Sequence, residues 1–129
     1  MEYGLLVMGA PYVSAAPHSA LRFAQAVVKQ GHRVSGVFFY QDGIHNASKL
    51  MAPPQDELNM RSAWIELHEQ HDVALDVCIA AALRRGVMDE AEAKRHGQEN
   101  FNLESPFELT GLGQLLALQQ RCDRLITFA

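Results

Sequence analysis

Short apolar segments that alternate with stretches of helical period are the feature that most constrains the fold of this chain. Strands are predicted where apolar or β-branched residues run together, at residues 3–8, 33–40, 74–79, 107–109 and 125–128. Helices are predicted where apolar residues recur at helical spacing, at residues 19–30, about 59–70 and 112–121. Such alternation is typical of a parallel sheet with helices on both faces. We therefore expect one α/β domain over residues 1–129, a three-layer α/β/α fold with a mostly parallel sheet of about five strands.

Two further segments are expected to be helical outside this regular alternation. Residues 88–97, MDEAEAKRHG, place acidic residues early and basic residues late, which matches the helix dipole and predicts a short solvated helix. A short helix is also possible near residues 46–50, before Pro53 and Pro54, which lack the amide hydrogen that a helix interior needs. Residues 41–56 are therefore expected to form a loop region above the sheet.

Cys78 lies near the end of the predicted strand at residues 74–79. In open parallel sheets, functional sites occur beyond the carboxyl ends of the strands, so Cys78 is placed where a site is expected. One interpretation is a small buried hydrophobe, because free cysteine is among the most buried residue types. The other is a reactive thiol, because Arg84 and Arg85 would supply positive potential that favours the thiolate. On the residues alone both interpretations stay open. Cys122, at the end of the last predicted helix, is interpreted as a packed, inert thiol.

Composition and charge exclude several classes of protein. The formal net charge of −4 and the pI near 5.8 argue against a broad phosphate-binding surface, so no direct contact with nucleic acid is expected. No apolar run approaches the length that crosses a bilayer, and the N-terminal residues lack the pattern of a signal peptide. We therefore expect a cytoplasmic protein without a membrane segment, whose two cysteines are both free in a reducing compartment.

Motifs for cofactors, metals and hydrolytic chemistry are incomplete or missing. The loop at residues 9–19 has neither the three-glycine fingerprint of dinucleotide binding nor the lysine of a P-loop, and the GLG at 111–113 lacks the third glycine. His68 and His71 have no nearby cysteine pair or carboxylate set to complete a tetrahedral metal site. The GxSxG motif of α/β hydrolases is absent. We expect neither a cofactor nor a metal ion.

Several short motifs, weak singly but specific together, place the chain near a known family. These are VFFYQDGIHNASKL at residues 37–50, Cys78 with the AAALRRG that follows, Asp89-Glu90, ELTGLGQL at 108–115, and Cys122-Asp123-Arg124. With them the chain resembles, essentially from end to end, the DsrE and TusD branch of the small sulfurtransferases. The resemblance implies a DsrE-like fold and a sulfur-relay subunit in which Cys78 carries sulfur as a persulfide.

The resemblance also implies partners and a pathway. The subunit would join TusB-like and TusC-like chains in a heterohexamer, receive sulfur from a TusA-type donor and pass it to a TusE-type acceptor for 2-thiolation of the tRNA wobble uridine. Cys122 matches a cysteine of TusD-like members, which favours this pathway. The alternatives are a DsrE-type subunit in dissimilatory sulfur oxidation and, from a different class, a noncatalytic scaffold with a buried, unreactive Cys78. A homohexamer also stays possible where the partner chains are missing.

The chemistry of thiols agrees with the role of a carrier. Sulfur passes when one thiolate attacks the persulfide of another chain, so a single accessible cysteine is sufficient. Arg84 or Arg85, or a helix N-terminus that faces the site, would stabilise the thiolate or persulfide anion.

Overall fold

The computed structural model describes residues 1–129 as an α/β fold built on a five-stranded, all-parallel sheet with the order β4-β3-β2-β1-β5. The strands are β1 (Glu2–Val7), β2 (Arg33–Phe39), β3 (Ala74–Cys78), β4 (Phe107–Thr110) and β5 (Arg124–Phe128). The helices are α1 (Ala16–Lys29), the 3₁₀ helix η1 (Gln41–Ala47), α2 (Met60–His71), α3 (Ile79–Arg84), α4 (Glu90–Arg95) and α5 (Leu112–Arg121). No helix is long and apolar enough to cross a membrane. The predicted fold class is confirmed.

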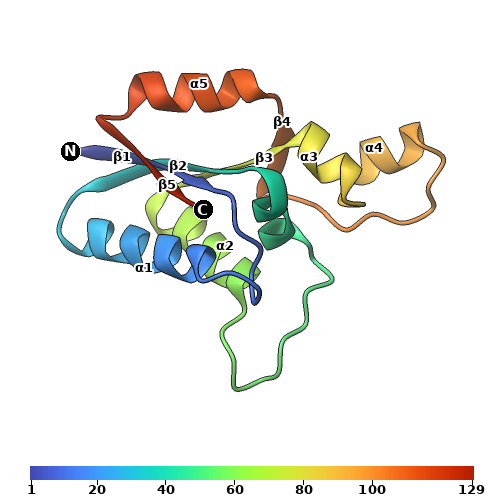
Figure 1. The fold of residues 1–129 in the computed structure, drawn as a ribbon, viewed down its shortest axis with the longest axis horizontal. Helices are drawn as coiled ribbons and strands as arrows, with labels where there is room; N and C mark the ends of the chain where they lie inside the picture. The colour runs from blue at the N-terminus through green and yellow to red at the C-terminus, as the bar shows by residue number, and fades with distance from the viewer.

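The sheet has two unequal faces. Helices α1 and α2 lie side by side on one face, whereas α5 lies alone on the other, and α3 and α4 extend from the carboxyl end of β3 (Figure 1). On the α1 and α2 face, Val7, Phe39 and Val77 form one row across β1, β2 and β3, and each is fully buried. The Phe39 ring meets the Trp64 ring of α2 edge-on, with 5.4 Å between centroids. Burial of these side chains makes this face the main hydrophobic core.

Several boundaries differ from the sequence prediction, most of them by one or two residues. Helix α1 begins at Ala16, because Pro17 fits the first turn of a helix, where its missing N–H is not needed. The predicted strand at residues 74–79 ends at Cys78, and Ile79 already opens α3. The helical turn expected near 46–50 lies earlier, as η1. The end of β3 could not be placed from the sequence, because the apolar run at residues 77–83 has no glycine or proline to mark the change of structure.

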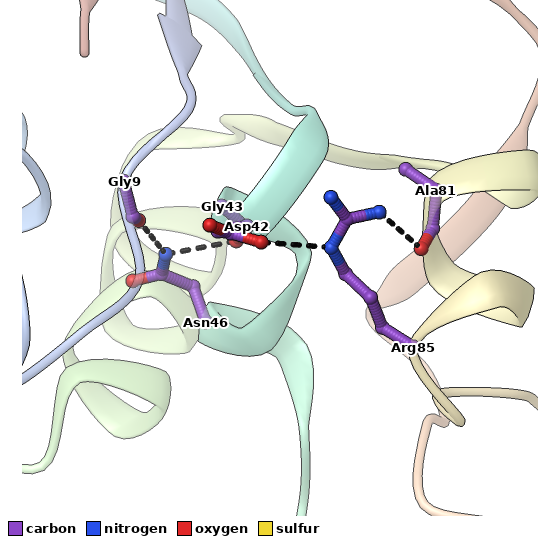
Figure 2. Close-up of polar contacts among 6 residues, drawn as sticks. All are labelled: Gly9, Asp42, Gly43, Asn46, Ala81 and Arg85. Carbon is purple, nitrogen blue, oxygen red and sulfur yellow. Dashed lines mark hydrogen bonds and ion pairs between the residues drawn. The ribbon is translucent and has the colours of Figure 1, made fainter.

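A buried asparagine fastens η1 to the rest of the fold. Asn46 is fully buried, and its Nδ2 donates to the carbonyl oxygen of Gly43 at 2.8 Å and to that of Gly9 at 3.3 Å (Figure 2). Its Oδ1 accepts a hydrogen bond from Trp64 Nε1 at 3.1 Å. The loop after β1, the helix after β2 and α2 are thus joined by one satisfied polar group, a buried arrangement that specifies a unique packing.

The face under α5 is shaped by small residues. A Cβ at Gly4 would lie 3.0 Å from Leu118, and one at Gly36 would lie 3.3 Å from Nη2 of Arg121, so both glycines let α5 approach the sheet closely. Only Leu118 of α5 is buried, whereas Leu112 and Leu116 are 50% and 56% exposed. A single helix therefore covers this face incompletely.

Replacing Gly43 should test how tightly η1 rests on β1. A Cβ at Gly43 would overlap the carbonyl oxygen of Val7, which is backbone and cannot move aside. We expect Gly43→Ala to lower the free energy of unfolding by about 2–4 kcal/mol in denaturant titrations. Gly113→Ala is the matched control, because a Cβ there meets nothing within 4 Å, and within α5 it should stabilise by about 0.5–1 kcal/mol. Equal effects of the two changes would contradict this account.

The stability of the chain should depend on pH through Asp76. Burial, and then the neighbouring Glu108 carboxylate, raise the pKa of Asp76 above its ordinary value of 3.8, while Arg121 opposes the shift. A raised folded-state pKa means that ionisation of Asp76 costs stability as the pH rises through that pKa, and that the cost is absent below the unfolded value. Asp76→Asn should therefore raise the melting temperature at pH 7, and the gain should vanish below about pH 3.5. A gain of the same size at both pH values would be inconsistent with this cause.

Candidate functional site

Cys78 stands at an abrupt change of backbone structure. It is the last residue of β3 and also the N-cap of α3, with φ −62° and ψ 116°, so the chain passes from strand to helix without a loop. Ala74, Asp76 and Cys78 alternate along β3 and therefore share one face of the sheet. Gly36, the register partner of Ala74, lies under Arg121 of α5, which identifies this as the α5 face. Cys78 thus lies at the carboxyl edge of the sheet, as predicted.

A pocket of about 320 Å³, here called the Cys78 pocket, opens at this edge. It is formed where the end of β2, the β3–α3 junction and the start of α5 meet. Its lining residues are Tyr40, Cys78, Ile79, Ala80, Arg84, Gly111 and Leu112. Most of these side chains are apolar or small, so the pocket offers few polar contacts beyond the thiol and one guanidinium.

The thiol is at once a core residue and a pocket residue. Cys78 is only 3% exposed and belongs to the main hydrophobic cluster, which agrees with the buried-hydrophobe interpretation. It also lines the pocket, so the second interpretation is not excluded by its burial. The sequence prediction of an accessible thiol needs adjustment, because access to the sulfur is limited to the pocket. A reaction partner therefore has to bring its reacting atom into the pocket.

Two helices begin at the Cys78 pocket without a side-chain cap. The N-termini of α2 and α4 are capped by Asn59 and Asp89, whose side chains accept hydrogen bonds from backbone N–H groups of the first turn. At α3 and α5 the N-cap residues are Cys78 and Gly111, and neither side chain makes such a bond. Free N–H groups at a helix start favour negative charge. A thiolate or persulfide anion at Cys78 would meet the kind of helix N-terminus that the sequence analysis expected, and the structure identifies the helices as α3 and α5.

The structure separates the two arginines predicted to assist Cys78. Arg84 is exposed and lines the pocket. Arg85 is directed elsewhere: its Nε donates to Oδ1 of Asp42 at 2.8 Å and its Nη1 to the carbonyl oxygen of Ala81 at 3.2 Å (Figure 2). Arg85 therefore joins η1 to α3, while Arg84 remains the arginine placed to act on the thiol.

Cys122 lies at the opposite end of α5 from the Cys78 pocket. It is the C-cap residue of that helix, and its Sγ is 3.8 Å from the carbonyl oxygen of Gln119. A Cβ at Gly4 would lie 3.1 Å from this sulfur, so Cys122 contacts the start of β1. Both cysteines are free thiols. The placement is in keeping with a packing role for Cys122.

Separate replacement of the two arginines should separate their roles. Arg84→Gln removes positive charge from the pocket, so alkylation of Cys78 by iodoacetamide at pH 7 should slow severalfold while the free energy of unfolding is unchanged. Arg85→Gln should lower the free energy of unfolding by about 0.5–1 kcal/mol, the range of a partly exposed ion pair, and leave the alkylation rate within twofold. The measurements are mass-resolved alkylation rates and denaturant titrations, with Cys122→Ser as the background. The reverse pattern would show that the two roles are exchanged.

Comparisons with known proteins agree with this geometry. The model of the DsrE/DsrF-like family matches residues 1–128. A relative from Salmonella newport (strain SL254), named Sulfurtransferase TusD, is 46% identical over 128 residues, which cover 99% of this chain and all of the relative. The crystal structure of the ychN protein from E. coli superposes with a TM-score of 0.75 at 21% identity, covering 99% of this chain and all of that one, and this likeness concerns the fold.

Proposed function

This chain belongs to the DsrE/DsrF-like family, and we propose that it is a sulfurtransferase of a sulfur relay in which Cys78 carries the sulfur as a persulfide. The observation that supports the carrier role is the position of Cys78 in a pocket where the uncapped starts of α3 and α5 meet. Sulfur transfer needs one thiolate that a partner can reach, together with groups that stabilise its negative charge. Cys122, at the far end of α5, has no such surroundings.

The proposed reaction is an exchange between sulfur atoms. The Cys78 thiolate attacks the terminal sulfur of a donor persulfide, a new S–S bond forms at Cys78, and the donor's S–S bond breaks to release the donor thiolate. The acceptor's thiolate then attacks the terminal sulfur on Cys78 in the same way and regenerates the Cys78 thiolate. Each step breaks one S–S bond and forms another, so no external oxidant or reductant is consumed. The N–H groups and Arg84 act by stabilising the anionic sulfur between the steps.

The proposed pathway is 2-thiolation of the tRNA wobble uridine. It is supported by the 46% identity to a relative named Sulfurtransferase TusD over nearly the whole of both chains. On this proposal the chain is a cytoplasmic subunit that joins TusB-like and TusC-like chains, takes sulfur from a TusA-type donor and delivers it to a TusE-type acceptor. The net charge of −4 favours protein partners over direct contact with tRNA.

The low exposure of Cys78 supports one alternative, a noncatalytic scaffold whose cysteine is packing. At 3% exposure the sulfur has the burial of an ordinary core residue. The two functions differ in one measurable property, because a scaffold does not take up sulfur on Cys78.

Intact-mass spectrometry after incubation with a small-molecule persulfide donor tests the proposal. We expect the wild-type protein to gain one sulfur atom that a reducing agent removes, because the donor can enter the Cys78 pocket. The gain should persist in Cys122→Ser and disappear in Cys78→Ser. A gain that Cys78→Ser retains would assign the carrier role to another residue. No gain in any of the three proteins, with an active donor, would favour the scaffold.

A further inference from the structure

A second pocket lies on the α5 face, at the amino-terminal half of the strands. It has a volume of about 360 Å³ and is lined by charged side chains from the strands and by Arg121 from the last turn of α5. We call it the Asp76 pocket. The Cys78 pocket lies at the start of α5 and Arg121 lies in its last turn, so the helix separates the two pockets along the sheet. The sulfur-transfer proposal uses none of the residues that line this second pocket.

The deepest polar group of the pocket has no partner. Asp76 is only 6% exposed, and no side chain or backbone group forms a hydrogen bond or an ion pair with its carboxylate. The carboxylate oxygens border the pocket and still reach solvent there, but burial of the residue removes part of their hydration, which is costly for an unpaired carboxylate. An unpartnered carboxylate that borders a cavity indicates that the missing donor comes from outside the chain.

Glu108, the neighbour of Asp76 on the next strand, adds a second negative charge to the pocket. Glu108 is the register partner of Asp76 in the β3–β4 pair, so the two acidic side chains project from the same face. Both line the pocket. Like charges directly opposite one another are destabilising. Arg121 lowers the pKa of Asp76 from a distance but does not come within ion-pair range of either acid.

The chemistry of the lining selects the kind of ligand. Glu2 and Asp72 also line the pocket. The basic groups in the lining are the guanidinium groups of Arg33 and Arg121 and the imidazole of His68, so acidic groups are in excess. No group of three or more His, Cys, Asp or Glu side chains is arranged to hold a metal ion. A nitrogen cation meets the requirement instead, because it brings positive charge and several N–H donors to neighbouring carboxylates.

We propose that the Asp76 pocket binds the guanidinium or ammonium group of an arginine or lysine side chain of a partner protein. A protein is the source that fits, because the pocket opens beside the sheet face that α5 covers only in part, and Leu116 of that helix is 56% exposed. The inserted cation neutralises Asp76 and Glu108 together. The site thereby fixes the orientation of the partner on this face.

Titrations of the whole chain with blocked amino acids test this site. Nα-acetyl-arginine methylamide and its lysine counterpart are added to ¹⁵N-labelled protein at pH 7.5, with neutral Nα-acetyl-citrulline methylamide as the isosteric control. We expect saturable shifts of the amide signals of Asp76, Glu108 and Arg121 with a dissociation constant on the order of 1–10 mM, as for one isolated side chain. The citrulline probe should bind at least fivefold more weakly.

Variants decide whether the pocket causes these shifts. Asp76→Asn and Glu108→Gln should each weaken binding of the arginine probe at least fivefold, whereas Glu99→Gln, at an exposed carboxylate that lines no pocket, should leave it unchanged. Equal binding of the citrulline probe, or equal loss in Glu99→Gln, would overturn the site. Equally tight binding of methylammonium would overturn its assignment to a side chain. These outcomes do not depend on sulfur uptake at Cys78, so failure here and failure of the proposed function are distinguishable.

Discussion

The direct passage from β3 into α3 is the constraint on which the candidate site depends. With no loop between them, the register of β3 in the sheet determines where α3 begins and where the Cys78 sulfur lies. The strand is held on both sides, by β2 and by β4, and η1 packs against α3 from the end of β2. The buried Asn46 and the Asp42–Arg85 pair fasten η1 in turn (Figure 2). The position of one sulfur atom is thus set by backbone pairing rather than by a mobile loop.

The helices next to the Cys78 pocket begin differently from α2 and α4. Capping by Asn59 or Asp89 satisfies the first N–H groups of α2 and α4, and a cap of this kind typically contributes about 1 kcal/mol. At α3 and α5 this contribution is absent, and both starts border the Cys78 pocket. Sequence features that weaken a helix locally can leave its dipole available to an anion. The α5 face shows a similar combination. Gly4 and Gly36 let α5 pack closely on the sheet, whereas Asp76 on the same face is left without a partner.

Much of the architecture could be predicted from the sequence, because alternating strands and helices permit few arrangements other than a parallel sheet. The position of Cys78 at the end of β3 also followed from the apolar run that precedes it. The start of α3 could not be located, because residues 77–83 are apolar throughout and fit a strand or a helix equally well. The sequence also could not show that Arg84 lines the pocket while Arg85 pairs with Asp42, because Asp42 is 43 residues away from Arg85 in the sequence. Contacts between distant segments decided what local pattern left open.

The burial of Cys78 has a consequence for the chemical lifetime of its sulfur. Oxidation of cysteine to sulfenic and higher acids depends on exposure as well as on thiolate character. Cys78 is 3% exposed and its thiol borders the Cys78 pocket, so oxidation by dissolved oxidants should be slower than for a thiol on the open surface. On the proposed function, such a thiol would combine uptake of sulfur from a donor that fits the pocket with slow side reactions. How fast a solute reacts with this thiol is then governed by its entry into the pocket as well as by the intrinsic reactivity of the sulfur.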